Sequence, residues 1–167
     1  MARIADSLIQ ELEQEAGTTK RLLERVPEDK LDWQPHQKSM SLGKLAHHVA
    51  TTAGDMAGIA SVDAFDFGTF SGSEQSKTNS DLLAAHEASI SKAKGFLDAM
   101  DDAQAMATWK ATMQGKELMA MPRVAMLRTM MLNHSVHHRG QLSVYLRLLD
   151  IPVPSIYGPS ADENPFE

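Results

Sequence analysis

Four stretches of the chain repeat apolar residues at the spacing of an amphipathic helix. The first covers residues 4–26, where one face carries Ile4, Leu8, Leu12, Ala16, Leu22, Leu23 and Val26 and the charged positions lie mostly on the other. Pro27 ends it, because proline cannot continue a helix interior. The second is capped by Ser39 or Ser41 and keeps its apolar face over residues 42–56.

The third and fourth stretches occupy the second half of the chain. The third spans residues 80–100 and is capped by Asn79 or Ser80. The fourth is the longest, residues 120–149, and becomes regular at Pro122, because proline is tolerated in a first helical turn.

The segments between these stretches lack helical spacing. Residues 58–79 are rich in Gly, Ser, Asp and Thr, which predicts a long loop, and residues 101–114 break the pattern, with Thr108–Met113 favouring a short extended piece. Residues 150–160 form an irregular tail that we expect to fold back over the helices. Together these patterns predict an all-α protein, a four-helix bundle with a long loop between its second and third helices and an irregular C-terminal tail, in a single domain over residues 1–167.

Composition excludes several classes of function. The 167 residues include no cysteine, so any metal would be held by His, Asp, Glu or water. The net charge is -6, with Lys and Arg scattered among Asp and Glu, so we expect no nucleic-acid partner. No run approaches about 18 consecutive apolar residues. We therefore expect a soluble, cytoplasmic protein with no membrane partner.

Two histidines lie on the apolar face of the fourth predicted helix. On a wheel of about 100° per residue, His134 and His138 share a line with Leu127, Met130, Met131, Gln141, Tyr145, Leu148 and Leu149. Residues four apart have Cβ atoms about 5 to 6 Å from each other, so both imidazoles can reach one cation. The alternative is that each is a core histidine bonded to a carbonyl or carboxylate, and the spacing leaves both interpretations open.

A third ligand would come from another helix. In the second predicted helix, the wheel places His48 about 100° from the middle of the apolar face and His47 about 160° from it. We therefore expect His47 in solvent and His48 at the flank of the core, from which it can turn inward. His86, on the apolar side of the third predicted helix, is a substitute for His48.

Two motifs resemble the DinB/YfiT-like superfamily of metal-binding four-helix bundles, which shares a name but no fold with the translesion DNA polymerase. One motif is residues 39–50, SMSLGKLAHHVA, and the other is Asn133 and His134 followed by residues 137–141, HHRGQ. The resemblance spans nearly the whole chain. It implies that one histidine of the first motif and two histidines four apart on the last helix bind a divalent metal, typically nickel or zinc. Mapped onto this sequence, these ligands are His48, His134 and His138.

The resemblance also implies a class of reaction. Some members look like transferases or isomerases that use a low-molecular-weight thiol, which implies a metal-dependent, thiol-dependent S-transferase or isomerase-like enzyme acting on a small molecule. A metallohydrolase and a non-catalytic, stress-related metal-binding bundle are the alternatives. A metal-free dimeric bundle with satisfied core histidines is a third. Relatives often form homodimers, so we expect a homodimer here.

Three residues beside the histidines complete the sequence prediction. Gln141 lies one turn beyond His138 and is expected to bond a ligand histidine or a bound water. His137, at the edge of the stripe, is expected to line the site or bond a loop backbone. Arg139 lies about 140° from His134 and is expected in solvent or at a subunit contact. The sequence names no general base, and three imidazoles also suit copper and iron(II).

Overall fold

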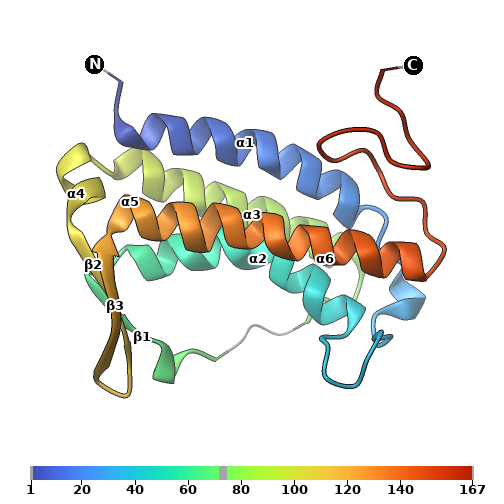
Figure 1. Ribbon diagram of the computed structural model, residues 1–167, viewed down its shortest axis with the longest axis horizontal. Coiled ribbons are helices and arrows are strands. Elements are labelled where there is room, and N and C mark those ends of the chain that lie inside the picture. Colours follow the sequence, from blue (N-terminus) through green and yellow to red (C-terminus); the bar gives the residue numbers. More distant parts are fainter. Residues whose placement is uncertain (1, 72–74, 167) are drawn as a thin grey trace.

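Four long helical segments lie side by side in the computed structural model, which describes residues 2–71 and 75–166 (Figure 1). They are α1 (Ile4–Leu23), α2 (Leu42–Ala60), α3 (Asn79–Ala99) and a continuous segment made of α5 (Arg123–Met126), η3 (Leu127–Asn133) and α6 (His134–Leu148). The shorter helical elements are η1 (Glu28–Lys30), η2 (Phe67–Thr69) and α4 (Asp102–Met106). Each predicted helical stretch therefore forms a helix.

Among the described helices, none has both the length and the apolar character needed to cross a membrane. The expected homodimer stays a prediction.

Side-chain caps fix where α2 and α3 begin. The Ser41 hydroxyl accepts the Lys44 N–H at 3.3 Å, which confirms one of the two predicted caps of α2. At α3 the cap is Thr78 instead of the predicted Asn79 or Ser80. Its hydroxyl accepts the Asp81 N–H at 3.0 Å and its own N–H donates to the Asp81 carboxylate, so the two residues satisfy each other in a capping box.

A small three-stranded sheet makes the prediction of an all-α fold wrong in part. The strands are β1 (Ala64–Asp66), β2 (Thr108–Met113) and β3 (Lys116–Pro122), with β1 parallel and β3 antiparallel to β2. Strand β2 confirms the predicted extended piece. Strand β1 lies inside the segment predicted as one long loop, residues 58–79. Strand β3 includes residues 120–122, which were predicted to begin the fourth helix.

A two-residue turn explains why β3 is a strand. Gln114 and Gly115 both have positive φ, 51° and 79°, the backbone that a tight hairpin turn requires. The Asp66 carboxylate accepts their two N–H groups at 3.0 Å each, so the turn is tied to the end of β1. Residues 116–121 are mostly good helix formers, and local propensity therefore concealed a strand that turn geometry and pairing impose.

The buried side chains divide into two apolar clusters, one toward each end of the helices. One cluster includes Trp109 and Met131, and the other includes Leu45 and Leu142. Each of the four long helices contributes apolar residues to both clusters. Between its two sets of apolar residues, each helix carries one or two buried polar residues: Thr19, Thr52, His86, Ser89, His138 and Arg139. We refer to these six residues as the polar layer. Polar groups removed from water need partners, so this layer is where contacts between helices are specific.

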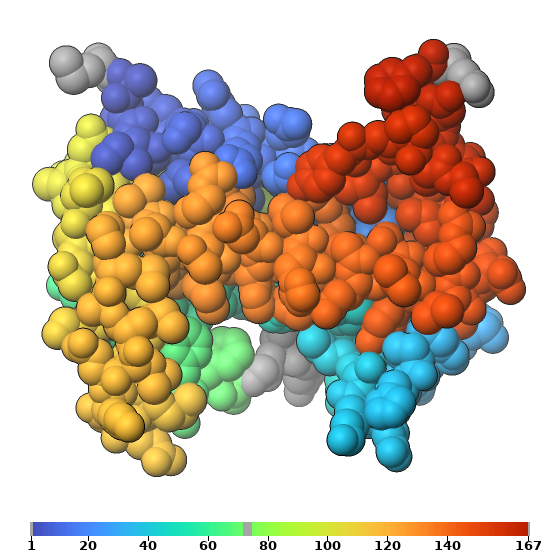
Figure 2. Space-filling model, in the orientation of Figure 1, coloured from blue at the N-terminus to red at the C-terminus, as the bar shows by residue number. Residues whose placement is uncertain are grey.

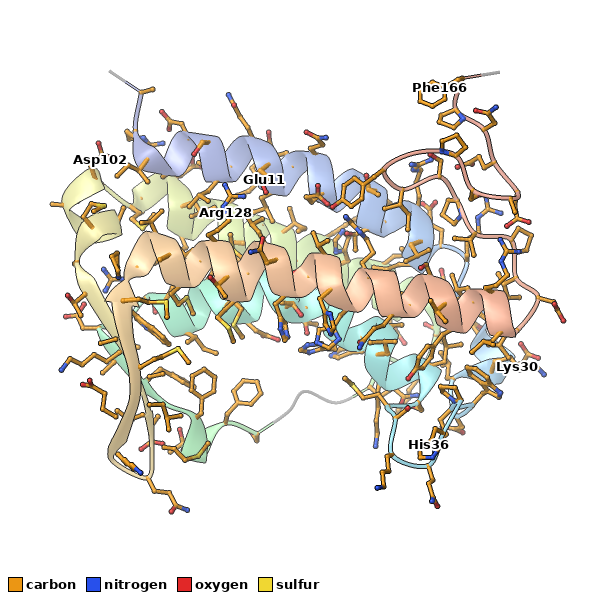
Figure 3. All side chains as sticks on the ribbon, in the orientation of Figure 1. Glu11, Lys30, His36, Asp102, Arg128 and Phe166 are labelled. Atoms are coloured by element: carbon orange, nitrogen blue, oxygen red, sulfur yellow. The ribbon has the colours of Figure 1, made fainter. Side chains whose placement is uncertain are left out.

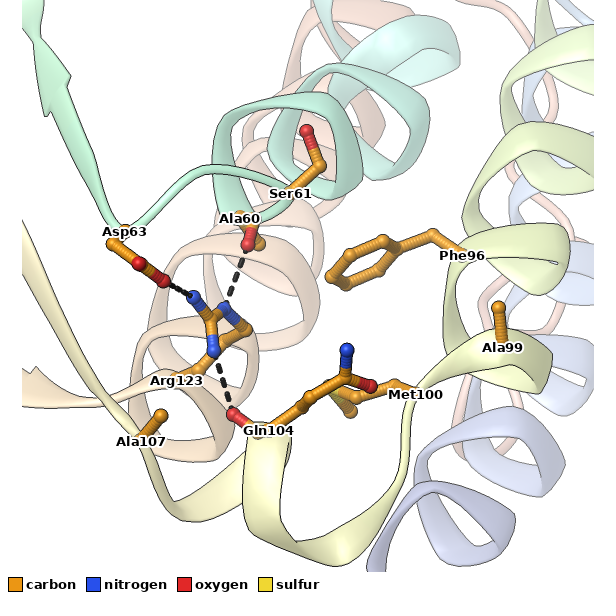
Figure 4. A pocket seen from close by; sticks show the side chains of 9 residues that line it. All are labelled: Ala60, Ser61, Asp63, Phe96, Ala99, Met100, Gln104, Ala107 and Arg123. Atoms are coloured by element: carbon orange, nitrogen blue, oxygen red, sulfur yellow. Dashed lines mark hydrogen bonds and ion pairs between the residues drawn. The ribbon is translucent and has the colours of Figure 1, made fainter.

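Arg123 lines a cavity of about 240 Å³ near the ends of α2 and α3 and binds three groups beside it (Figure 4). Its buried guanidinium donates to the carbonyl oxygens of Ala60 at 2.8 Å and Gln104 at 2.6 Å, and to the Asp63 carboxylate at 2.6 Å. Carbonyls near helix C-termini lack partners within the helix. Arg123 therefore joins the ends of α2 and α4 to the residue before β1, and its role is structural.

Helices α2 and α3 approach closely at Gly54. The Ser89 hydroxyl accepts the Gly54 N–H at 2.7 Å and donates to the Thr51 carbonyl at 2.9 Å. A Cβ atom at position 54 would lie 2.9 Å from the Ser89 Cα and 3.0 Å from its carbonyl oxygen, which is backbone that cannot rotate away. This contact places α2, the helix that carries His48, against the polar layer.

We predict that Gly54→Ala destabilises the fold by about 1–3 kcal/mol, the usual cost of overpacking a tight contact. Gly95→Ala is the matched control, because a Cβ at that position of α3 meets nothing within 4 Å. Alanine is the better helix former, so this control should stabilise the protein by about 0.5–1 kcal/mol. Urea unfolding followed by circular dichroism measures both. Equal stability of Gly54→Ala and the wild type would contradict the close approach.

Candidate metal centre

Three histidines from two helices converge on one point. His48 lies in the middle of α2, His134 begins α6, and His138 follows one turn later. One ring nitrogen from each lies within 4.8 Å of the others, and the Nε2 atoms of His48 and His134 are 3.0 Å apart. Zinc–nitrogen bonds are about 2.0–2.1 Å long, so two nitrogens on one tetrahedral ion lie about 3.3–3.4 Å apart. The widest separation in the cluster exceeds that spacing by at most about 1.5 Å, so side-chain rotations would let all three imidazoles bind one ion.

Gln141 decides which ring nitrogen of His138 carries the proton. Its Oε1 lies 2.7 Å from the Nδ1 of His138. An amide oxygen can only accept, so Nδ1 carries the proton and the Nε2 lone pair of His138 is left for another partner. Hydrogen bonds of this kind orient metal-binding histidines in proteins. The structure thus places Gln141 in contact with His138, one of the candidate ligands.

The surroundings keep the three rings uncharged. Burial lowers the pKa of His48 to about 4, with further contributions from His138 and His134, while Asp55 acts weakly in the opposite direction. Burial also lowers the pKa of His134 and of His138, and the bond to Gln141 opposes the shift at His138. An imidazole must be neutral to bind a metal, and these three are neutral at pH 7. The group contains only histidines, with no acidic ligand among the described residues.

His137 lies at the exposed edge of the cluster. Its side chain is exposed, and its ring centroid is 4.9 Å from that of His138, in an edge-to-face arrangement. It therefore borders the three histidines and lies outside the group whose nitrogens converge; the expected role of His137 in lining the site stays a prediction.

Two other histidines lie elsewhere than the sequence suggested. His47, expected in solvent, is half-buried with its Nδ1 2.8 Å from the Ser76 hydroxyl, because the chain leading into α3 returns across α2. His86, the proposed substitute for His48, is buried in the polar layer with its Nε2 3.1 Å from the Ala16 carbonyl. It joins α3 to α1 as a core histidine. A further histidine, His36, lies on the exposed loop before α2 (Figure 3).

The predicted position of Arg139 is wrong. The sequence placed it in solvent or at a subunit contact, yet its side chain is 2 % exposed. Leu142 and Leu146 are also fully buried, whereas Gln141 and Leu148, expected on the buried line, are exposed.

The reason for the shift is η3, which is a π-helix directly before His134. A π-turn uses i→i+5 hydrogen bonds and contains an extra residue, so it rotates every later side chain relative to a uniform α-helix. The ion pair between Arg128 of η3 and Glu11 of α1, 2.6 Å between Nη1 and Oε2, holds this segment against α1 (Figure 3). Such segments are rare and occur often at functional sites.

Comparison with known proteins relates the sequence of the chain to a family. The sequence profile described as "DinB family" matches residues 1–165. An uncharacterized protein of Bacillus subtilis, YrdA, is 26% identical over 167 residues, covering 98% of this chain and 93% of its own.

Two solved structures share the fold. A DinB-like protein from Bacillus cereus superimposes with a TM-score of 0.73 at 19% identity, over 94% of this chain and 100% of the other. A DinB-like protein from Bacillus subtilis, YjoA, gives a TM-score of 0.68 at 22% identity, over 87% and 96%.

The depressed pKa of His48 predicts how the metal-free protein responds to acid. Between pH 6.5 and about 4 the unfolded chain binds a proton at this residue that the folded chain does not, so the free energy of unfolding decreases as the pH falls through that window. We expect His48→Asn to lose less stability than the wild type between pH 7 and pH 5. Urea unfolding in the presence of a chelator measures the difference.

The control for this experiment is His36→Asn, which removes an exposed imidazole outside the cluster. Like His48→Asn it replaces one histidine by asparagine, so it separates the effect of position 48 from that of losing a histidine in general. Parallel pH profiles of the wild type and His48→Asn would contradict the burial of a neutral imidazole at position 48.

Proposed function

The chain belongs to the DinB family, and from that premise we propose that it binds one divalent metal ion, zinc or nickel, through His48, His134 and His138 and uses it as an enzyme. The observation that carries the proposal is the convergence of three neutral imidazoles from two separate helices. Zinc and nickel accept imidazole ligands readily, which supports these ions. An all-histidine set of three protein ligands is typical of catalytic zinc sites, where further positions stay open to substrate.

The residues around the cluster support a role in positioning the ligands. Gln141 holds the Nδ1 proton of His138 and thereby directs Nε2 toward the other two rings. His137 is exposed beside His138, where a small molecule coming from solvent would meet it. A bound zinc or nickel ion would supply a Lewis acid that lowers the pKa of a thiol or water beside it.

For the substrate we propose a small molecule, with a low-molecular-weight thiol as the attacking group of an S-transferase or isomerase-like reaction. Zinc and nickel both accept sulfur ligands, and the resemblance of the two histidine motifs to the family points to the same class. Hydrolysis by an activated water is the alternative within the same site. Both reactions would use the same three ligands.

Metal content is the first test. We predict about one zinc or nickel ion per chain in protein made without a histidine tag, measured by elemental analysis, because three neutral imidazoles already face one another. His134→Ala leaves two ligands and should lose most of the metal, whereas His36→Ala, on the exposed loop before α2, should keep it. Wild-type protein without bound metal, even after dialysis against zinc, would refute the proposal.

Turnover separates an enzyme from a metal-binding protein. We expect the zinc- or nickel-loaded protein to join low-molecular-weight thiols to small electrophiles, with a rate that His134→Ala abolishes. Activity should return when metal is restored to chelator-treated wild type. Hydrolysis of activated esters without thiol transfer would favour the metallohydrolase, and full metal occupancy with neither activity would remove the enzymatic part of the proposal.

A non-catalytic role is the second candidate, because the three imidazoles come from α2 and from α6 and an ion would tie these helices together. In that case metal binding stabilises the folded state by mass action and supplies no chemistry. A thermal melt with and without chelator tests this role. A large loss of melting temperature without any thiol binding would favour it over the enzyme.

A further inference from the structure

Arg139 is a charged side chain that α6 buries directly after His138. Its Nη1 donates to the Glu15 carbonyl at 3.2 Å and to the Thr19 hydroxyl at 3.1 Å, and its Nη2 pairs with the Glu15 carboxylate. The Glu15 side chain is itself only 16% exposed. A buried guanidinium is tolerated only when its donors have partners in a fixed geometry. These bonds therefore hold one face of α6 against α1.

Tyr157 brings the C-terminal tail to the same point. Its hydroxyl accepts from Arg139 and donates to the Glu15 carboxylate at 2.8 Å, and the guanidinium carbon lies 5.0 Å from the centre of its ring. The tail folds back along α1 and α6 (Figures 1 and 2), where Arg21 of α1 also bonds the Ser155 carbonyl. Three parts of the chain that are distant in sequence thus meet at one guanidinium.

The rotation of α6 about its axis decides where His134 and His138 point. The π-helical segment η3 precedes them, and its i→i+5 hydrogen bonds accommodate one residue more than the i→i+4 bonds of an α-helix. The same sequence wound as an α-helix throughout would rotate α6 by about 100°. Arg139 would then face solvent and the two histidines would turn into the core. The bonds from Arg139 to α1 can form in only one of these two rotations.

We propose that Arg139, held by α1 and the C-terminal tail, is a positioning residue that fixes the rotation of α6 so that His134 and His138 face His48. The inference rests on the proposed metal centre. Arg139 touches none of the three ligand nitrogens and acts through the helix that carries two of them. The role needs the planar fork of arginine, since two of its nitrogens are used at once on α1 and the tail.

The test compares metal affinity with stability in three variants. Arg139→Lys keeps the charge but loses the fork, and we expect it to weaken Zn²⁺ affinity by about 10–100-fold, the range seen when a group that orients a metal ligand is removed. It should also change the visible absorption spectrum of the Co²⁺-loaded protein. Tyr157→Phe keeps the ring but loses the hydroxyl, and it should weaken Zn²⁺ binding by less, about 3–10-fold.

Tyr145→Phe is the matched control, because it also removes one tyrosine hydroxyl, which donates to the Met40 carbonyl at 3.2 Å and makes no contact with Arg139. It should keep the wild-type Zn²⁺ affinity and Co²⁺ spectrum even if it lowers the melting temperature. Should Arg139→Lys fail to fold, the comparison of Tyr157→Phe with Tyr145→Phe tests the inference. Wild-type affinity and spectrum in Arg139→Lys or, failing that, in Tyr157→Phe would overturn the inference. Absence of Zn²⁺ and Co²⁺ binding in the wild type would instead remove the proposed metal centre.

Discussion

Three uncharged imidazoles whose rings meet edge to face at mid-length of the helices are the constraint on which the structure depends. Their pKa values are lowered mainly by burial and partly by each other, so protonation would place like charges together in a half-buried site. Such an arrangement gives the fold little by itself. It becomes favourable when the nitrogen lone pairs share one cation, which is why we interpret the cluster as a metal centre.

Contacts elsewhere in the molecule fix the two helices that carry the three histidines. Buried polar residues divide the core into two apolar clusters, and His138 of that polar layer meets His48 and His134 at its edge. Gly54 lets α2 lie close to α3, and Arg139 holds α6 against α1, so both helices that carry candidate ligands are fixed by specific contacts. The small sheet at one end, tied by Asp66, takes no part in the cluster.

The sequence predicted the helices because they follow from local periodicity, whereas the three-histidine set was implied by the resemblance of two motifs to a family. It failed where tertiary contacts override that periodicity. The strand β3 contains good helix formers, and only the turn at Gln114 and Gly115 with its contact to Asp66 makes it a strand. Arg139 was placed in solvent because a uniform wheel cannot contain a π-turn, and no residue in η3 signals one. The same wheel placed His134 and His138 in the middle of the buried face, whereas in the structure their ring nitrogens face His48.

The identity of the atoms around a bound ion tests the central claim most directly. X-ray absorption spectroscopy of the zinc-loaded, untagged protein should show a shell of nitrogen neighbours at about 2.0–2.1 Å with the outer-shell scattering of three imidazole rings. His48→Asn should reduce that scattering to two rings. A shell dominated by carboxylate oxygen, or a spectrum of the wild type that His48→Asn leaves unchanged, would contradict the account.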